Sequence, residues 1–161
     1  MQVEELDAIK FSSGFGNPPD RDNPGHTQTT SSESRGRGQK ILVVDDSLAW
    51  LRLAREILTA GGYQVHACEH APDALSLFKE NARQFDLVIT DLQMPCLDGV
   101  RLAAELLKIN AALPVVLTSA AQVEMTSEKL QSLGIREFLT KPWERERLFS
   151  ILQQILAHTR S

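Results

Sequence analysis

The chain has 161 residues, of which 42% are hydrophobic, 24% charged and 6% aromatic, and its 21 acidic and 17 basic side chains leave a formal net charge of -4. This composition is typical of one soluble globular domain and excludes collagen-like, disulfide-rich and wholly disordered proteins, while the negative charge argues against a nucleic-acid partner. The two cysteines, Cys68 and Cys96, are too few for a disulfide framework, and no apolar run approaches the roughly 18 residues of a membrane span. We therefore expect a cytoplasmic protein that contacts no membrane.

The N-terminal part of the chain differs in composition from the rest. Ser, Gly, Pro, Asn, Asp and Thr dominate residues 12–39, which cannot bury enough apolar surface to offset the entropy lost on ordering. We interpret residues 1–39 as a flexible N-terminal extension and residues 40–161 as one domain.

From Lys40 onward, five short apolar runs alternate with five segments of helical periodicity. The runs cover residues 41–44, 63–68, 85–90, 113–118 and 135–139. At least three of them are apolar nearly throughout, as expected for strands that are covered on both faces. This alternation predicts an α/β fold in which a doubly wound parallel sheet carries helices on both faces.

Capping residues and helix breakers mark the expected helix ends. Ser47 is placed to cap the first helix, Pro72 suits the first turn of the second, and Asp98 or Gly99 opens the third. We expect a fourth helix at about residues 123–133. The fifth carries a broad apolar stripe close to the end of the chain.

Polar side chains follow four of the predicted strands. Asp45 and Asp46 follow the first strand, Asp91 the third, Thr118 and Ser119 the fourth, and Lys141 the fifth. In an open parallel sheet, ligands bind beyond the carboxyl ends of the strands, so these side chains are expected to meet at one edge. Three neighbouring acids repel one another, and Mg²⁺ is the natural compensation because it binds carboxylate, water and phosphoryl oxygens. Such a site suits phosphoryl transfer, with Asp91 best placed as the nucleophile and Lys141 as a positive point charge.

Four motifs, in this order and at these spacings, resemble those of the receiver domains of two-component response regulators. They are ILVVDD at residues 41–46, DLQMPCLDG at 91–99, PVVLTSA at 114–120 and KPW at 141–143. The resemblance covers residue 40 to about residue 157. It implies a flavodoxin-like (βα)5 fold, with a five-stranded parallel sheet of strand order 2-1-3-4-5.

The resemblance also implies a role for each residue at the strand ends. Asp91 matches the phosphoacceptor, and Asp45 and Asp46 match the acidic pair that organises Mg²⁺. Asp91 itself and the backbone carbonyl of Gln93 are expected to complete the protein's share of the metal ligands. Lys141 matches the lysine that contacts the phosphoryl group.

Two further positions match the switch residues of the family. Of the two candidate hydroxyls, Thr118 and Ser119, Ser119 is in the family register, and Phe138 matches the aromatic switch position. The resemblance implies that Ser119 turns toward a phosphoryl group and that Phe138 then moves inward, which changes the face formed by the fourth helix, fifth strand and fifth helix. It also implies a cis peptide bond between Lys141 and Pro142.

The expected function is that of a binding module under phosphorylation control. It receives a phosphoryl group from a histidine kinase or a histidine phosphotransfer protein and presents the changed face to a downstream protein target, turning over no metabolite. Because the chain ends a few residues after the last helix, we expect a stand-alone receiver or the C-terminal receiver of a hybrid sensor kinase.

Three alternatives share parts of this pattern. A haloacid-dehalogenase-like phosphatase also uses Asp, Mg²⁺ and Lys, but it needs Asp-x-Asp after the first strand, where this chain has Asp45, Asp46 and Ser47. A flavodoxin-like flavin binder needs a hydroxyl- and glycine-rich first loop instead of an acidic pair. A constitutive interaction module would not need a complete site.

Overall fold

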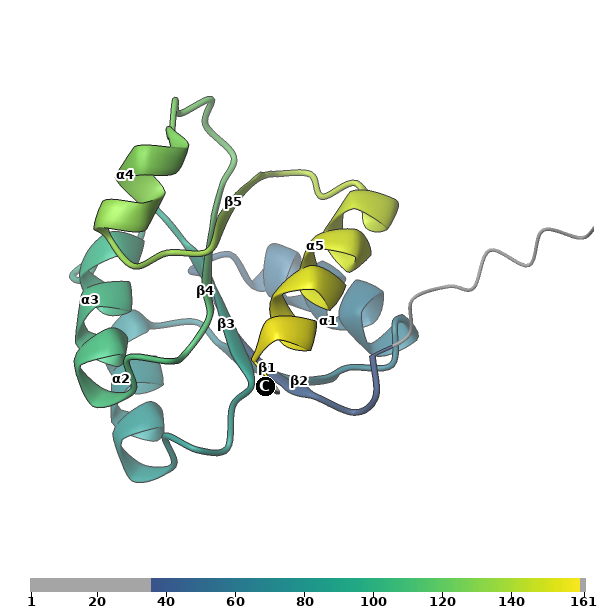
Figure 1. Ribbon diagram of the computed structural model, residues 1–161, viewed down its shortest axis with the longest axis horizontal. Coiled ribbons are helices and arrows are strands. Elements are labelled where there is room, and N and C mark those ends of the chain that lie inside the picture. The colour runs from purple at the N-terminus through teal and green to yellow at the C-terminus, as the bar shows by residue number, and fades with distance from the viewer. Residues whose placement is uncertain (1–35, 160–161) are drawn as a thin grey trace, which may run out of the picture. The chain divides into compact units, whose positions relative to one another are not determined.

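A five-stranded parallel sheet forms the centre of the domain (Figure 1). The computed structural model describes residues 36–159, and the extension predicted for the N-terminus lies outside them up to residue 35. The strands are β1 (Lys40–Val44), β2 (Gln64–Cys68), β3 (Leu87–Asp91), β4 (Val115–Ser119) and β5 (Glu137–Thr140). Their order is β2-β1-β3-β4-β5, and every neighbouring pair is parallel, which confirms the predicted flavodoxin-like topology.

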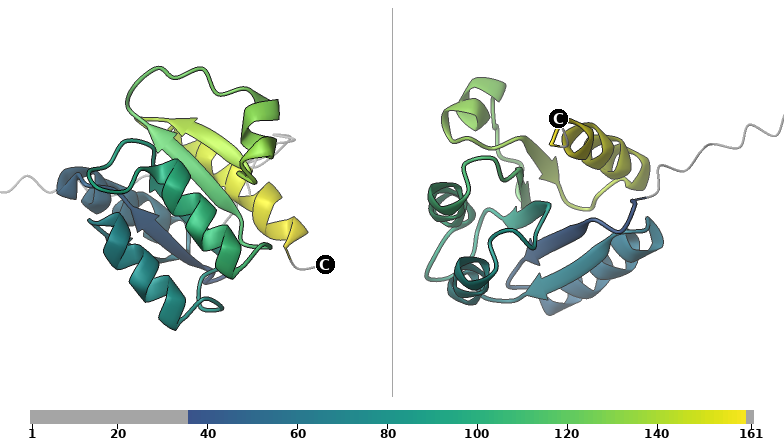
Figure 2. Two further views of the ribbon diagram at one scale, coloured as in Figure 1. Left: turned by 90° about the vertical axis from the view of Figure 1, so that its left-hand side faces the viewer. Right: turned by 60° about the horizontal axis from the view of Figure 1, so that its bottom comes forward.

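Helices cover both faces of this sheet, and each follows one of the strands. They are α1 (Leu48–Ala60), α2 (Ala71–Glu80), α3 (Gly99–Ile109), α4 (Ser127–Ser132) and α5 (Arg145–His158). Helices α1 and α5 lie on one face and α2, α3 and α4 on the other, as the right-hand view of Figure 2 shows. The sheet is therefore the middle layer of three.

The central strands carry apolar side chains on both faces, and both faces are covered by helices. Successive side chains of a strand point to opposite faces. In β1, Ile41 and Val43 join the apolar cluster under α1 and α5, whereas Leu42 and Val44 join the cluster under α2, α3 and α4. All four side chains are buried. Burial on both sides leaves the polar residues of the strands concentrated at their ends.

Most helix starts are those that the sequence predicts. The Ser47 hydroxyl accepts a hydrogen bond from the Trp50 N–H at 3.3 Å and caps α1. The Asp98 carboxylate accepts one from the Arg101 N–H at 2.8 Å and caps α3, while a proline occupies the first turn of α2. The caps fix where the chain leaves the strand ends and turns back along the sheet.

Helix α4 is shorter than the sequence predicts. The expected helix of residues 123–133 is wrong at its N-terminal end, because the helix begins only at Ser127. The Thr126 hydroxyl accepts a hydrogen bond from the Lys129 N–H at 3.2 Å and so caps the helix at this later point. A left-handed glycine, Gly134 with φ 71°, follows its end. The loop between β4 and α4 is correspondingly longer.

Within residues 36–159, none of the helices combines the length and the apolar character that crossing a membrane requires.

Candidate functional site

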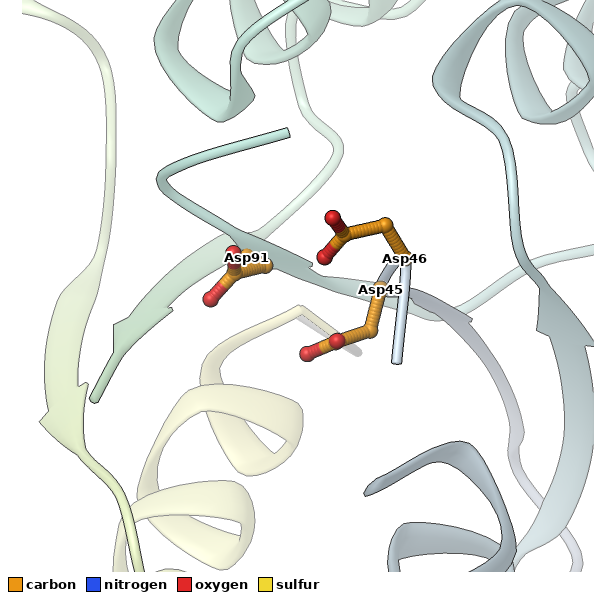
Figure 3. Close-up of side chains that lie close together, drawn as sticks. All are labelled: Asp45, Asp46 and Asp91. Atoms are coloured by element: carbon orange, nitrogen blue, oxygen red, sulfur yellow. The ribbon is translucent and has the colours of Figure 1, made fainter. Parts of the chain in front are cut away.

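Three carboxyl groups meet at the carboxyl ends of β1 and β3. Asp91 is the last residue of β3, and Asp45 and Asp46 directly follow β1, which pairs with β3 in register. One oxygen of each carboxylate lies within 4.8 Å of the others, and Figure 3 shows the three side chains close together. Asp45 is only 1% exposed and Asp91 6%, whereas Asp46 is open to solvent. The sequence-predicted acidic residues are thus brought together.

Lys141 reaches this acidic group from the far side of β4. It directly follows β5, and its N–H donates to the Ser119 carbonyl at 2.8 Å. Its ammonium group donates to Asp91 Oδ1 at 2.9 Å and to Asp45 Oδ2, and the lysine side chain is 11% exposed. The peptide bond between Lys141 and Pro142 is cis, as expected. One cation therefore bridges the carboxylates of two neighbouring strands.

Burial controls the electrostatics of Asp45. It raises the pKa of the Asp45 carboxyl above its ordinary value of 3.8, an effect that hydrogen bonds from Lys141 and the Ser47 N–H partly offset. The Ser47 N–H donates to Asp45 Oδ1 at 2.9 Å. A buried carboxylate whose charge is still disfavoured gains from a further cation beside it.

The donor set fits a hard divalent cation. Asp45, Asp46 and Asp91 each offer a carboxylate oxygen, the ligand type that Mg²⁺ prefers, and Asp46 is exposed to water. Among residues 36–159, one ammonium group, that of Lys141, contacts these acids, so three carboxylates are balanced by one cation and a further cation would neutralise the remaining negative charge. The residues present are therefore suited to Mg²⁺.

The loop after β3 holds Asp91 in place. The Gln93 N–H donates to Asp91 Oδ2 at 3.2 Å, and the Leu92 N–H donates to the Thr118 carbonyl of β4 at 2.7 Å. The backbone of Gly99 closes the loop by donating to the Leu92 carbonyl at 3.0 Å. A side chain at Gly99 would collide with the Asp91 carbonyl, so α3 packs this closely against the site only with glycine there. The metal-binding role expected for the Gln93 carbonyl stays a prediction.

The two candidate switch hydroxyls at the end of β4 have different partners. The Thr118 hydroxyl accepts a hydrogen bond from the Trp143 indole N–H at 3.0 Å, on the α1 and α5 side of the sheet. The Ser119 hydroxyl accepts one from the Ala121 N–H at 3.1 Å, within the loop that follows β4. Among the hydrogen bonds of the described residues, the Ser119 hydroxyl is thus bonded only to the backbone of its own loop.

The expected aromatic switch residue, Phe138, lies in β5 beside Leu117 of β4. Its side chain is half-buried and packs against the apolar cluster under α2, α3 and α4. It does not belong to the group of charged side chains. A ring that is half-exposed at the sheet edge has room to become more buried.

Sequence analysis missed one residue beside the charged group. The Trp50 ring centroid lies 5.0 Å from the Lys141 ammonium nitrogen and 5.0 Å from the Trp143 ring centroid. The sequence did offer a signal for it, because Trp50 lies in the first turn of α1, four residues after Asp46. The first turn of a helix that follows a strand lies at the carboxyl end of that strand, which places Trp50 near the charged group. The contact with Lys141 joins residues far apart in sequence and could not be read from spacing.

Comparison with known proteins agrees with this arrangement. The family model of the response regulator receiver domain matches residues 41–153. The chain is 37% identical over 119 residues to the two-component response regulator ORR24 of Oryza sativa subsp. indica, covering 74% of this chain and 19% of that protein. It is 36% identical over 121 residues to the transcriptional regulatory protein ZraR of Salmonella typhimurium, covering 74% and 27%. The chain thus spans only about a fifth to a quarter of the length of these curated relatives.

Solved structures share the fold. A response regulator receiver domain protein from Clostridium thermocellum has a TM-score of 0.71 at 27% identity, covering 76% of this chain and 97% of that one. The signal receiver domain of an HD domain-containing protein from Pseudomonas fluorescens has a TM-score of 0.68 at 29% identity, with 77% and 98% covered. Together with the family match over most of the described residues, these likenesses show that the chain belongs to the response regulator receiver domains of two-component systems.

Proposed function

We propose that this receiver domain is a phosphoacceptor in a two-component phosphorelay and that Asp91 carries the phosphoryl group. The observation that carries the proposal is the Lys141 ammonium bridging Asp91 and Asp45 beside Asp46. A nucleophilic carboxylate, a neighbouring point charge and an all-oxygen donor set are the parts that phosphoryl transfer requires. The expected donor is a phosphohistidine of a histidine kinase or of a histidine phosphotransfer protein.

The chemistry is a displacement at phosphorus. An Asp91 carboxylate oxygen forms a bond to phosphorus while the P–N bond of the phosphohistidine breaks, and the electron pair of that bond leaves with the imidazole, which takes up a proton. Lys141 is placed to stay beside the oxygens of the transferred group, since its ammonium already touches Asp91. Mg²⁺ held by Asp45, Asp46, Asp91 and the Gln93 carbonyl would neutralise negative charge on the phosphoryl oxygens. The domain modifies only itself and turns over no metabolite.

The signal would be a change of the surface formed by α4, β5 and α5. A phosphoryl group brings roughly -1.5 to -2 charge and new acceptor oxygens. The Ser119 hydroxyl accepts a hydrogen bond from the Ala121 N–H, and after turning toward Asp91 it could donate its own O–H proton to one of these oxygens. Inward movement of Phe138 in β5 would then follow, and a downstream protein would bind the altered face.

We also propose that the protein acts in the cytoplasm, either alone or as a part of a hybrid kinase, with residues 1–39 as an extension of the domain.

Intact mass spectrometry tests the proposal directly. The native protein is incubated with acetyl phosphate and Mg²⁺, alongside Asp91→Asn and Asp98→Asn. Asp98 lies at the end of the loop that follows Asp91 and caps α3 with its side chain exposed, so it is a matched control for a lost carboxylate. We expect one added phosphoryl group on the native and Asp98→Asn proteins and none on Asp91→Asn, with the addition lost in EDTA.

A second donor-independent measurement covers receivers that do not accept small phosphodonors. Beryllofluoride with Mg²⁺ would occupy the place of the phosphoryl group on Asp91, and the fluorescence of Trp143, which is bonded to Thr118 beside the site, is expected to change. No added mass and no fluorescence change would contradict the proposal and favour a constitutive interaction module. Steady hydrolysis of small phosphoesters would favour the phosphatase alternative instead.

A further inference from the structure

The Lys141 ammonium has an aromatic neighbour as well as its two carboxylates. An ammonium group carries three N–H donors, and two of them are used by Asp45 and Asp91. The Trp50 ring lies with its centroid 5.0 Å from the same nitrogen, which is within the range of a cation–π interaction. The ring thus faces the Lys141 ammonium from the side of α1.

Trp50 is itself held by a second tryptophan. The two rings meet edge to face, with their centroids 5.0 Å apart and their planes at 84°. Trp143 is only 7% exposed, and its indole N–H donates to the Thr118 hydroxyl at 3.0 Å. The support of the Trp50 ring is therefore anchored to β4, next to Ser119.

No hydrogen bond of the Trp50 indole N–H to the described residues fixes the position of the ring. This nitrogen is buried and has no hydrogen-bond partner among the described residues. A buried donor without a partner costs free energy, so other contacts must hold the ring where it is. Contacts that do so include the edge-to-face pair with Trp143 and the cation–π contact with Lys141.

We propose that Trp50 is a positioning residue of the phosphoryl-transfer site, whose ring face holds the Lys141 ammonium beside Asp45 and Asp91. The role rests on the proposed function, because it matters only if Lys141 assists transfer to Asp91. The ring attracts the ammonium without offering an oxygen that competes for its protons. It also covers part of a lysine that is only 11% exposed and that would otherwise sample many rotamers.

The test compares Trp50→Phe, which keeps an aromatic face, with Trp50→Leu, which keeps only apolar bulk. Leu48→Ala is the matched control, because Leu48 lies in the same turn of α1 and is 53% exposed. The first readout is the chemical shift of the Lys141 ε-protons in protein carrying ¹³C-labelled lysine, with the signal assigned by its loss in Lys141→Met. The second is the rate constant of phosphorylation by acetyl phosphate, followed by intact mass below the melting temperature of each variant.

We expect a ring-current shift of the Lys141 signal in the native, Trp50→Phe and Leu48→Ala proteins, and its loss in Trp50→Leu. We expect phosphorylation of Trp50→Leu to slow by about tenfold, equivalent to about 1.4 kcal/mol of barrier, with Trp50→Phe within about threefold of native. If Trp50 served only to pack α1, Trp50→Phe would not be expected to keep both the ring-current shift of the Lys141 signal and the phosphorylation rate near their native values.

Two results would overturn the inference, and they differ. Phosphorylation of Trp50→Leu at the native rate, with an unshifted lysine signal in the native protein, would overturn the positioning role alone. A native protein that gains no phosphoryl group would overturn the proposed function and, with it, the role of Trp50.

Discussion

The hydrogen bond between Trp143 and Thr118 allows a quantitative prediction. Thr118→Val replaces the hydroxyl by a methyl group of nearly the same volume, so no cavity opens at this buried position. The Trp143 indole N–H, which donates to that hydroxyl at 3.0 Å, is then left without an acceptor in a side chain that is 7% exposed. Leaving a buried donor unpaired costs about 1–3 kcal/mol, and we expect about 2 kcal/mol from Thr118→Val.

The expected loss is large enough to measure by thermal unfolding. For a domain of roughly 120 residues, the entropy of unfolding of about 2.1 cal/mol/K per residue makes 1 kcal/mol equivalent to about 4 °C. Thr118→Val should therefore lower the melting temperature by about 8 °C in the absence of metal and phosphodonor. Circular dichroism of the native and variant proteins gives this difference.

A double-mutant cycle isolates the cause. In a Trp143→Phe background the indole donor is already gone, and replacing an unpaired buried hydroxyl by a methyl group is nearly neutral or stabilising. Thr118→Val should then cost close to nothing. Our reasoning would be refuted if Thr118→Val destabilised both backgrounds equally, or if it left the native background unchanged within about 0.5 kcal/mol.

Three other predictions concern the site and its loops. Burial raises the pKa of Asp45, so ionisation of this carboxyl destabilises the metal-free protein as pH rises through the raised pKa. In EDTA, the melting temperature of Asp45→Asn relative to that of the native protein should rise with pH above 3.8 and level off once Asp45 is fully ionised, and a difference that falls with pH would contradict this. Burial, and secondarily Asp73, raises the pKa of the half-buried Cys68 thiol and so lowers its reactive thiolate fraction. Iodoacetamide should therefore alkylate the exposed Cys96 first, and equal alkylation rates in peptide mapping would contradict this. Gln93→Ala should lengthen the half-life of the phosphorylated protein about threefold or more, because the small Ala121 leaves the placing of water to Gln93, and an unchanged half-life would exclude that role.

Much of the fold could be predicted because short stretches of sequence specify most of its strands and helix ends. The strands β1, β3 and β4 are apolar on both faces, and their limits agree with the predicted runs to within two residues. The caps at Ser47 and Asp98 depend on residues within three positions of each other. Such short-range signals can be read from the sequence without knowledge of the tertiary contacts.

The start of α4 was less predictable because its signals compete. Val123 and Met125 continue a helical apolar pattern, but Thr126 offers a hydroxyl cap that begins the helix later. Leu130 is the only buried residue of α4, so little packing energy opposes the shorter form. A helix with so small a buried face is decided by its cap rather than by its apolar period.

In the site, the residue types could be predicted and the contacts could not. The order of strand ends predicts that Asp45, Asp91 and Lys141 lie at one edge. It does not say that the ammonium touches both carboxylates, nor that Trp50 lies against it, because those contacts depend on side-chain rotamers across three strands and a helix.

The burial of the ion pairs around Lys141 also has a consequence for how the site responds to ionic strength. Mobile ions screen exposed charges over a Debye length of about 8 Å at physiological salt, but they screen buried pairs much less. The surface pair between Lys108 and Glu105, with side chains 70% and 42% exposed, should weaken as salt is added, whereas the contacts of Lys141 with Asp45 and Asp91 should persist. A salt dependence of phosphorylation by a partner protein would then report the encounter between the two surfaces, not the assembly of the site.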